Sequence, residues 1–285
     1  MSVFLDSELI INNGRIYHLD LKPEDICKDI ILVGDPLRVK VIAEKLDNIH
    51  FFNKNREFYS CKGSFNNKEI LIISTGIGTD NIDIVINELD ALSNINFSTR
   101  KVSLKKKSLN IYRLGTSGGV QKYDDEIVVS QYSIGLDGLA YYYESDDFLN
   151  TKISEKFKSH MNWPDALSLP YCVSCDDNLL KMFSSFKAGI TITATGFYAP
   201  QGRNLRLKSS IEDLHKKLED FKFNDLRILN FEMESSAIYF LSKMLGHKSI
   251  TICSVLSNRN IKTFKKEPKK IINKMIESSL SIISK

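Results

Sequence analysis

The chain has 285 residues, of which 42% are hydrophobic and 26% charged, so it can form the core of a globular protein. Its formal net charge of +4 is modest, and its lysine runs lack the interleaved aromatic residues of a nucleic-acid-binding surface. No stretch approaches the roughly 18 apolar residues that a membrane span requires. We therefore expect no nucleic acid and no membrane as partners. Acidic residues near the N-terminus argue against a signal peptide, so we expect a cytoplasmic protein. Cys172 and Cys175 form an isolated CxxC, so we expect no metal site.

Apolar, β-rich runs alternate with amphipathic helical stretches, which is typical of an α/β fold. The predicted strands are, in chain order, residues 30–33, 70–73, 110–114, 127–130, 190–194 and 249–255. The predicted helices begin at Pro36, after Asp35 as N-cap, and then cover residues 82–92, 233–245 and 271–283. We expect a single domain over residues 1–285, with the polar stretch 93–108 as an exposed excursion.

Two carboxylates, Glu232 and Glu234, flank Met233 where a polar loop is predicted to enter an apolar helix. In an extended segment this spacing sends both carboxylates to the same side. At a helix start the acids are also stabilised by the positive end of the helix dipole. The cluster is therefore either a helix cap or a site for paired hydroxyl groups.

The turn from Gly34 to Arg38 connects a predicted strand to a predicted helix. Backbone N–H groups at such a helix start point outward and bind anions. Arg38 lies one helical turn from Gly34, so its guanidinium can reach the same anion. An ordinary turn with an exposed arginine is the alternative.

Arg113 lies in an apolar strand, where an unpaired charge is costly, so it needs an acidic partner or a bound anion. We expect residues 115–119 to form the turn that closes this strand. Its glycines would let the backbone around Thr116 approach a ligand closely. The segment beginning at Gly76 superficially matches a dinucleotide-binding turn, but its last position is Asn81, so we reject that interpretation.

Residues 195–203 follow a strand and combine Phe197, Gln201 and Arg203. A flat heterocycle could stack on the phenyl ring while the amide and the guanidinium form hydrogen bonds to its edge. A solvated surface turn is the alternative. His18 and Arg56 have no local explanation.

Together these segments resemble nucleoside phosphorylase family I, and within it the uridine phosphorylases, from about residue 14 to residue 259. The landmarks are Gly34-Asp35-Pro36-x-Arg38, Asn55-Arg56-Glu57-Phe58, Ser74-Thr75-Gly76-Ile77-Gly78, Arg113-Leu114-Gly115-Thr116-Ser117-Gly118, Phe197-Tyr198-x-x-Gln201-x-Arg203 and Glu232-Met233-Glu234-Ser235. The resemblance implies an α/β domain with a central mixed, partly barrel-like β-sheet flanked by helices.

The resemblance also implies a role for each matching residue. Phosphate would be bound by Gly34, Arg38, Arg113 and Thr116, and by Arg56 from a neighbouring subunit. Ribose would be bound by Glu232, Met233 and Glu234, with His18 crossing the same interface, and the base by Phe197, Gln201 and Arg203. Catalysis would rest on Arg113, Arg203 and Glu234. The family implies a homo-oligomer with shared sites, usually a hexamer built of dimers, and inorganic phosphate as co-substrate without a metal or organic cofactor.

The implied reaction is phosphorolysis of uridine to uracil and ribose 1-phosphate. The Gln-x-Arg pair points to uracil, and purine-preferring relatives carry an aspartate where this chain has Asn258 after Ser257. Ala199-Pro200 and Gly202 depart from the usual pattern and leave the base preference open. The alternatives are a purine or broad-specificity phosphorylase, a nucleoside hydrolase of the same fold, and a binding protein without turnover.

Overall fold

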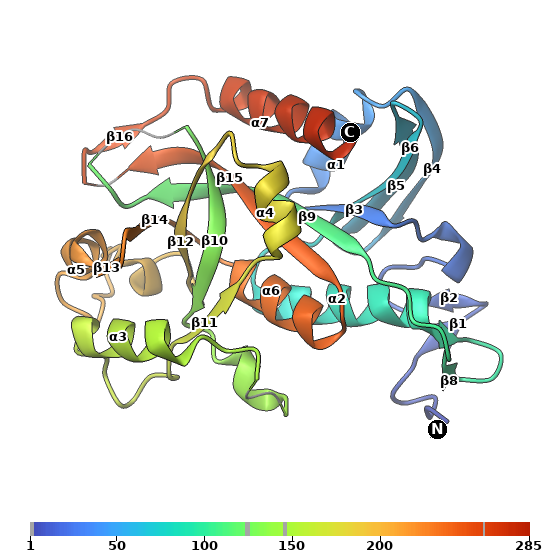
Figure 1. The fold of residues 1–285 in the computed structure, drawn as a ribbon, viewed down its shortest axis with the longest axis horizontal. Helices are drawn as coiled ribbons and strands as arrows, with labels where there is room; N and C mark the ends of the chain where they lie inside the picture. The colour runs from blue at the N-terminus through green and yellow to red at the C-terminus, as the bar shows by residue number, and fades with distance from the viewer. Residues whose placement is uncertain (1–2, 123–125, 145–146, 259) are drawn as a thin grey trace.

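The centre of the molecule is a mixed sheet in which five strands close into a barrel. The computed structural model describes residues 3–122, 126–144, 147–258 and 260–285 (Figure 1). The barrel strands pair in the order β9 (Asn110–Gly119), β15 (Lys248–Asn258), β10 (Ile127–Gly135), β12 (Lys187–Thr193) and β14 (Leu226–Glu232). Because β14 also pairs with β9, the ring is closed. The expected mixed, partly barrel-like sheet is confirmed.

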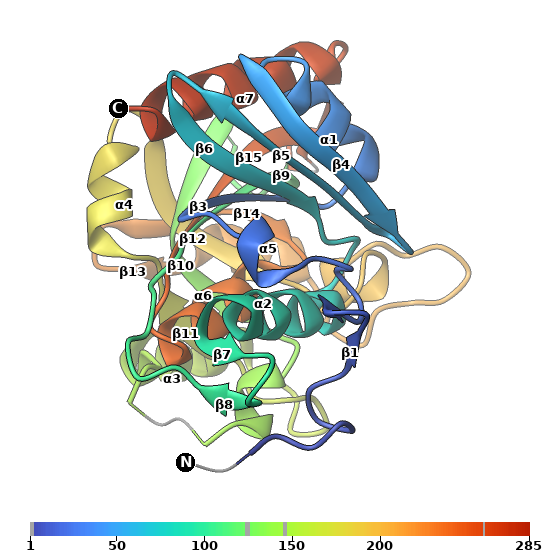
Figure 2. The same cartoon turned by 90° about the vertical axis from the view of Figure 1, so that its right-hand side faces the viewer.

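The same sheet continues beyond the barrel on the other side of β9. Its order there is β3 (Asp29–Val33), β6 (Lys68–Ser74), β5 (Phe58–Phe65) and β4 (Asn48–Asn55). Figure 2 shows β4, β5 and β6 as a twisted layer at one end of the molecule. Short strands border the sheet: β11 (Tyr171–Ser174) pairs with β10, β13 (Lys222–Phe223) with β14, and β16 (Thr263–Phe264) with β15.

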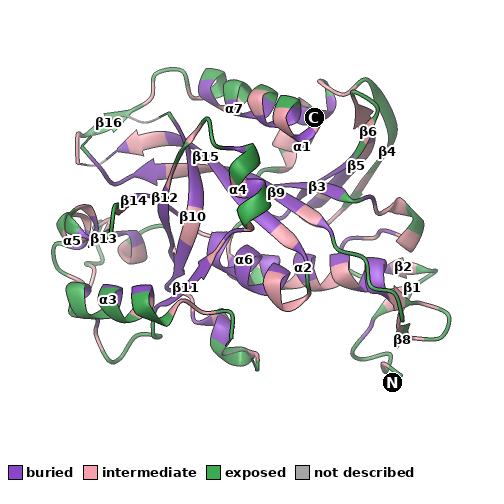
Figure 3. Ribbon diagram, viewed as in Figure 1, coloured by how far each residue is buried: buried purple, intermediate pink, exposed green. Residues whose placement is uncertain are grey.

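Helices cover the sheet on two sides. In Figures 1 and 2, α1 (Pro36–Ala43) and α7 (Pro268–Ile283) lie above it, and α2 (Thr79–Asn94) and α6 (Ser235–Met244) lie below it. The helices α3 (Thr151–Met161), α4 (Asp177–Met182) and α5 (Leu214–Asp220) lie around the barrel. Figure 3 shows the barrel strands largely buried, as apolar runs between two helix layers should be. Among the described residues, no helix is both long enough and apolar enough to cross a membrane.

The predicted strands and helices are present, but one predicted turn is wrong. Residues 115–119 continue β9 and pair with β15. Their glycines are needed for packing, since a Cβ atom on Gly118 would lie 2.6 Å from Cε2 of Phe231. A Cβ atom on Gly115 would lie 1.8 Å from Nη1 of Arg113, so this glycine makes room for a guanidinium that folds back over its own strand.

The helix predicted over 233–245 begins two residues later, at Ser235, and is followed by Gly246 in the left-handed region at φ 77°. The expected excursion 93–108 begins in the last turn of α2 and then forms a small ribbon of β7 (Ile95–Asn96) and β8 (Lys101–Val102). Arg100 in this ribbon donates to the carbonyl of Phe4 at 2.9 Å, so the excursion fixes the N-terminal segment.

Candidate active site

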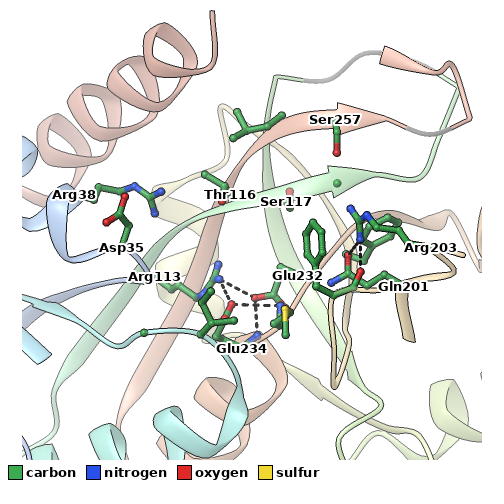
Figure 4. Close-up of a pocket in the computed structure, with 18 of the residues that line it drawn as sticks. Asp35, Arg38, Arg113, Thr116, Ser117, Gln201, Arg203, Glu232, Glu234 and Ser257 are labelled. Atoms are coloured by element: carbon green, nitrogen blue, oxygen red, sulfur yellow. Dashed lines mark hydrogen bonds and ion pairs between the residues drawn. The ribbon is translucent and has the colours of Figure 1, made fainter. Parts of the chain in front are cut away.

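One cavity of about 570 Å³ brings together most of the residues singled out in the sequence (Figure 4). It lies where β3, β6, β12 and β14 end, so loops from distant parts of the chain converge there. The carboxyl ends of parallel strands are the usual place for such a site in an α/β sheet. The predicted residues that line it are Gly34, Arg38, Arg113, Thr116, Phe197, Gln201, Arg203, Glu232, Met233 and Glu234.

The floor of the cavity holds Arg113 between two carboxylates. Its Nη2 atom donates to Oε2 of Glu234 and lies 3.3 Å from Oε2 of Glu232. Burial lowers the pKa of Arg113, but the charges of Glu234 and Glu232 outweigh this effect and raise it, so the guanidinium stays charged. The sequence required an acidic partner or an anion, and the structure supplies the acidic partners.

Cys253 on β15 also contacts Arg113. The Sγ atom of Cys253 lies 3.4 Å from the Nη1 atom of Arg113. Burial raises the pKa of the Cys253 thiol to about 12, even though the charge of Arg113 lowers it. The thiol is therefore neutral near pH 7 and does not add a third negative charge to the cluster.

The N-cap residue of α6 is Glu234, and the carboxylate of Glu232 accepts hydrogen bonds from the backbone at the start of this helix. The Oε2 atom of Glu232 accepts from the backbone N–H groups of Glu234 and Ser235, both at 3.0 Å, and Thr193 Oγ1 donates to Oε1 at 2.7 Å. Burial raises the pKa of Glu232, and the charge of Arg113 opposes this rise. The carboxylate is thus held by several donors at the start of α6.

Glu234 is held from the opposite wall by a residue whose role the sequence did not reveal. The backbone N–H of Gly78 donates to Oε1 of Glu234 at 2.9 Å. Gly78 is the N-cap residue of α2 and has φ 98°, a conformation that glycine adopts readily. In the sequence, Gly76 and Gly78 before a predicted helix indicated a turn and close helix packing. They did not indicate that the N–H of Gly78 contacts Glu234.

At one end of the cavity, the turn after β3 presents Arg38 beside β9. Asp35 accepts from the N–H of Leu37 at 2.9 Å and so caps α1, as predicted. The Nη1 atom of Arg38 donates to the carbonyl of Leu114 at 3.3 Å. Burial and the nearby charge of Arg113 lower the pKa of Arg38. Arg38 places a second guanidinium in the same partly enclosed space, and its positive charge would attract an anion, whereas Glu232 and Glu234 offset the charge of Arg113.

At the other end, the loop after β12 brings Gln201 and Arg203 together (Figure 4). Arg203 donates to the side-chain oxygen of Gln201 and, at 2.6 Å, to the carbonyl of Phe197. Its guanidinium carbon lies 3.8 Å from the centre of the Phe197 ring. The predicted trio is therefore assembled, and Arg203 covers one face of the Phe197 ring.

Two predicted residues, His18 and Arg56, lie outside the residues that line this cavity. The two residues lie close to each other, since Nη2 of Arg56 donates to the hydroxyl of Tyr17 at 3.2 Å and Asn55 donates to the carbonyl of His18 at 2.9 Å. Nδ1 of His18 lies 2.6 Å from Oε1 of Glu88. Their contribution to the site of a neighbouring subunit stays a prediction.

The cavity is also lined by residues to which the sequence analysis assigned no binding role, namely Asp35, Pro36, Gly76, Ile77, Ser117, Gly118, Phe231, Leu256, Ser257 and Phe264. Asn258 is not among the lining residues, and its amide donates to the carbonyl of Gln121 at 2.6 Å. Arg259 lies outside the described residues. Within the described parts of the chain, no group of three His, Cys, Asp or Glu side chains is arranged to hold a metal ion.

Comparison with known proteins links this arrangement to one family. A model of the phosphorylase superfamily matches residues 28–285. A solved structure from Trypanosoma brucei, described as a nucleoside phosphorylase that shows uridine phosphorylase activity, superposes with a TM-score of 0.84, at 26% identity and over 97% of this chain and 98% of that one. Uridine phosphorylase of Haemophilus influenzae is 25% identical over 94% of this chain and 99% of its own length. A DeoD-type purine nucleoside phosphorylase of Listeria monocytogenes is 24% identical over 84% of this chain and 85% of its own length.

The charge cluster on the cavity floor predicts a pH-dependent stability defect in Arg113→Met. Losing the cation leaves two carboxylates buried together, which should cost about 3–5 kcal/mol in the free energy of unfolding at pH 7. Burial already raises the pKa of Glu232, and removing the opposing charge of Arg113 raises it further. The folded variant therefore binds a proton more readily, and its deficit relative to the wild type narrows as the pH falls.

Urea titrations of the wild type and the variant at pH 5 and pH 7 measure this difference. Arg227→Met, on the exposed side of β14, is the control and should show little change at either pH. A deficit that is equal at both pH values would show that the two carboxylates do not respond to Arg113.

Proposed function

The chain belongs to the phosphorylase superfamily, and we propose that it catalyses phosphorolysis of uridine with inorganic phosphate, giving uracil and ribose 1-phosphate. The observation that carries the proposal is the order of groups along one cavity. Arg38 stands at one end, Arg113 and the carboxylate of Glu234 lie together in the middle, and Gln201 with Arg203 stands at the other end. This order matches phosphate, sugar and base. The uridine phosphorylases among the relatives support the choice of nucleoside.

Phosphate would occupy the positive end of the cavity. Arg38 and Arg113 would neutralise its charge, while Thr116 and the turn at Gly34 would supply further hydrogen-bond donors. Arg113 is fixed by its carboxylate partners and needs little reorganisation when the anion binds, which favours catalysis by preorganised charge.

The ribose would lie over Met233, with its hydroxyl groups on Glu234. Both oxygens of this carboxylate are already oriented, one by Gly78 and one by Arg113. A carboxylate held from two sides can accept hydrogen bonds from vicinal hydroxyls in a defined geometry. It would thereby hold the anomeric carbon C1′ in line with the attacking phosphate oxygen.

The base would lie at the end formed by Gln201 and Arg203. As phosphate forms its bond to C1′ and the bond from C1′ to N1 breaks, the electron pair moves onto uracil. Arg203 would stabilise this growing negative charge, and Gln201 would both donate to and accept from the pyrimidine edge. The proton that phosphate gives up balances the proton that uracil gains. The proposed reaction uses phosphate as co-substrate and requires no metal or organic cofactor.

The subunit arrangement is part of the same proposal. His18 and Arg56 lie together, outside the lining of the cavity in their own chain. We propose that they complete the site of an adjoining copy, His18 at the ribose and Arg56 at the phosphate. A homodimer would then be the smallest active unit, and a hexamer built of dimers the expected assembly.

The proposed reaction predicts that uracil release depends on inorganic phosphate. Uridine, 2′-deoxyuridine, thymidine and inosine, each with and without phosphate, can be compared by following the absorbance change as the base is released. Uridine with phosphate should give the highest kcat/KM. Base release that is independent of phosphate would instead identify a hydrolase. Preferred cleavage of inosine would identify a purine phosphorylase, the activity named for the Listeria relative.

A second prediction concerns Arg203. Arg203→Met should lower kcat/KM for uridine about a hundredfold or more, because the departing uracil loses a charged hydrogen-bond donor. Arg206→Met in the same loop, where Arg206 is exposed, is the matched control and should stay close to the wild type. Steady-state kinetics at saturating phosphate measure both variants. Equal activity of the two variants would remove Arg203 from the proposed mechanism.

A further inference from the structure

Two rows of buried polar side chains cross the inside of the barrel between β10, β12 and β14. One row contains Thr193 and Glu232, and the other contains Thr191 and Asn230. The parallel pairing of β12 with β14 sets Thr191 opposite Asn230 and Thr193 opposite Glu232. Since the two threonines are two residues apart on one strand, they point to the same side of the sheet.

The hydroxyl of Thr193 is fully used by its neighbours. It donates to Oε1 of Glu232 at 2.7 Å and accepts from the backbone N–H of Ser236 at 2.9 Å. The hydroxyl of Ser133 lies 2.9 Å away and can supply its second accepted hydrogen bond. A threonine hydroxyl has one donor and two lone pairs, so all of its hydrogen-bonding capacity is satisfied.

These contacts connect Thr193 to the floor of the cavity by two routes. Through Glu232 it reaches Arg113, whose Nη2 lies 3.3 Å from Oε2 of that carboxylate. Through the N–H of Ser236 it holds the first turn of α6, and Glu234 is the N-cap of that helix. Thr193 is itself completely buried and is not among the residues that line the cavity.

We propose that Thr193 is a positioning residue that fixes the Arg113–Glu234 pair for phosphate and ribose through Glu232 and the start of α6. The inference rests on the proposed function, because the proposed function assigns Arg113 to phosphate and Glu234 to the ribose of the nucleoside. Thr193 makes no contact with a substrate in this account. Its effect is geometric, since it keeps one cation and one carboxylate at a fixed separation and orientation.

The chain provides a matched control in Thr191. This residue is also almost completely buried, and its hydroxyl donates to the side-chain oxygen of Asn230 at 2.7 Å. Neither Thr191 nor Asn230 belongs to the lining of the cavity as the described residues define it. Replacement of either threonine by valine removes one hydroxyl from the same strand at nearly the same volume.

The experiment compares Thr193→Val, Thr193→Ser and Thr191→Val in the full chain. Both valine variants leave buried polar partners without a hydrogen bond, so both should lower the unfolding midpoint. Only Thr193→Val should lower kcat/KM for uridine, by about tenfold to a hundredfold, because it alone loosens the substrate-binding pair. Thr193→Ser should restore most of the activity, since serine keeps the hydroxyl.

Binding of inorganic phosphate, measured by calorimetry without nucleoside, provides a second readout that does not require turnover. Phosphate should bind several-fold more weakly to Thr193→Val than to Thr191→Val. Equal kinetics and equal phosphate binding in the two valine variants, with an active wild type, would overturn the role of Thr193 alone. A wild type that releases no uracil would overturn the proposed function, and the calorimetric comparison would still decide whether Thr193 positions Arg113.

Discussion

The site depends on one buried arrangement of charge, a guanidinium held between two carboxylates in the cavity. Arg113 comes from β9, and Glu232 and Glu234 come from the junction of β14 and α6. Moving such charges out of water is costly, so they are tolerated only with several well-placed partners. The backbone supplies many of these partners, including the N–H groups of Gly78 and Ser235. The fold is thus constrained by the same contacts that orient the groups proposed to bind substrate.

This arrangement also explains why parts of the barrel interior are polar. Thr193 extends hydrogen bonding from the cavity floor into β12, and Thr191 forms a separate polar pair with Asn230 further along the same strand, where a purely apolar core would be simpler to pack. A satisfied polar group specifies one geometry, and the hydrogen bonds of Thr193 are all satisfied, whereas the buried Nδ2 atom of Asn230 has no hydrogen-bond partner among the described residues. The closure of β14 onto β9 brings both sides of the network together, so barrel formation and site formation are linked.

The sequence predicted those features of the site that depend on residues close together in the chain. Asp35 and Pro36 marked the start of α1, and the spacing of Glu232 and Glu234 indicated either a helix cap or a binding site. Gly115 and Gly118 were misread as a turn, because a glycine required by close packing looks the same in sequence as one required by a turn. The partner that makes the difference, such as Phe231 beside Gly118, is more than 100 residues away in the chain.

Other elements lacked a clear pattern. Strand β4 (Asn48–Asn55) lies at the edge of the sheet and is largely exposed, so it shows no buried apolar face. Strand β14 is buried but contains Asn230 and Glu232, whose polarity interrupts the apolar run typical of an interior strand. The amide of Gly78 was not recognised as a partner of Glu234 because a backbone donor carries no side-chain signal. For β14 and Gly78 the missing information was the identity of a distant neighbour, whereas β4 was missed because it is exposed.

A crystal structure of the protein with phosphate and a uridine analogue that cannot be cleaved is the most direct test of where phosphate, ribose and base bind in the cavity. We predict a phosphate within hydrogen-bond distance of both Arg38 and Arg113, the ribose hydroxyls on Glu234, and the pyrimidine edge on Gln201 and Arg203. The central claim would be contradicted if phosphate bound elsewhere while Arg113 contacted only its two carboxylates.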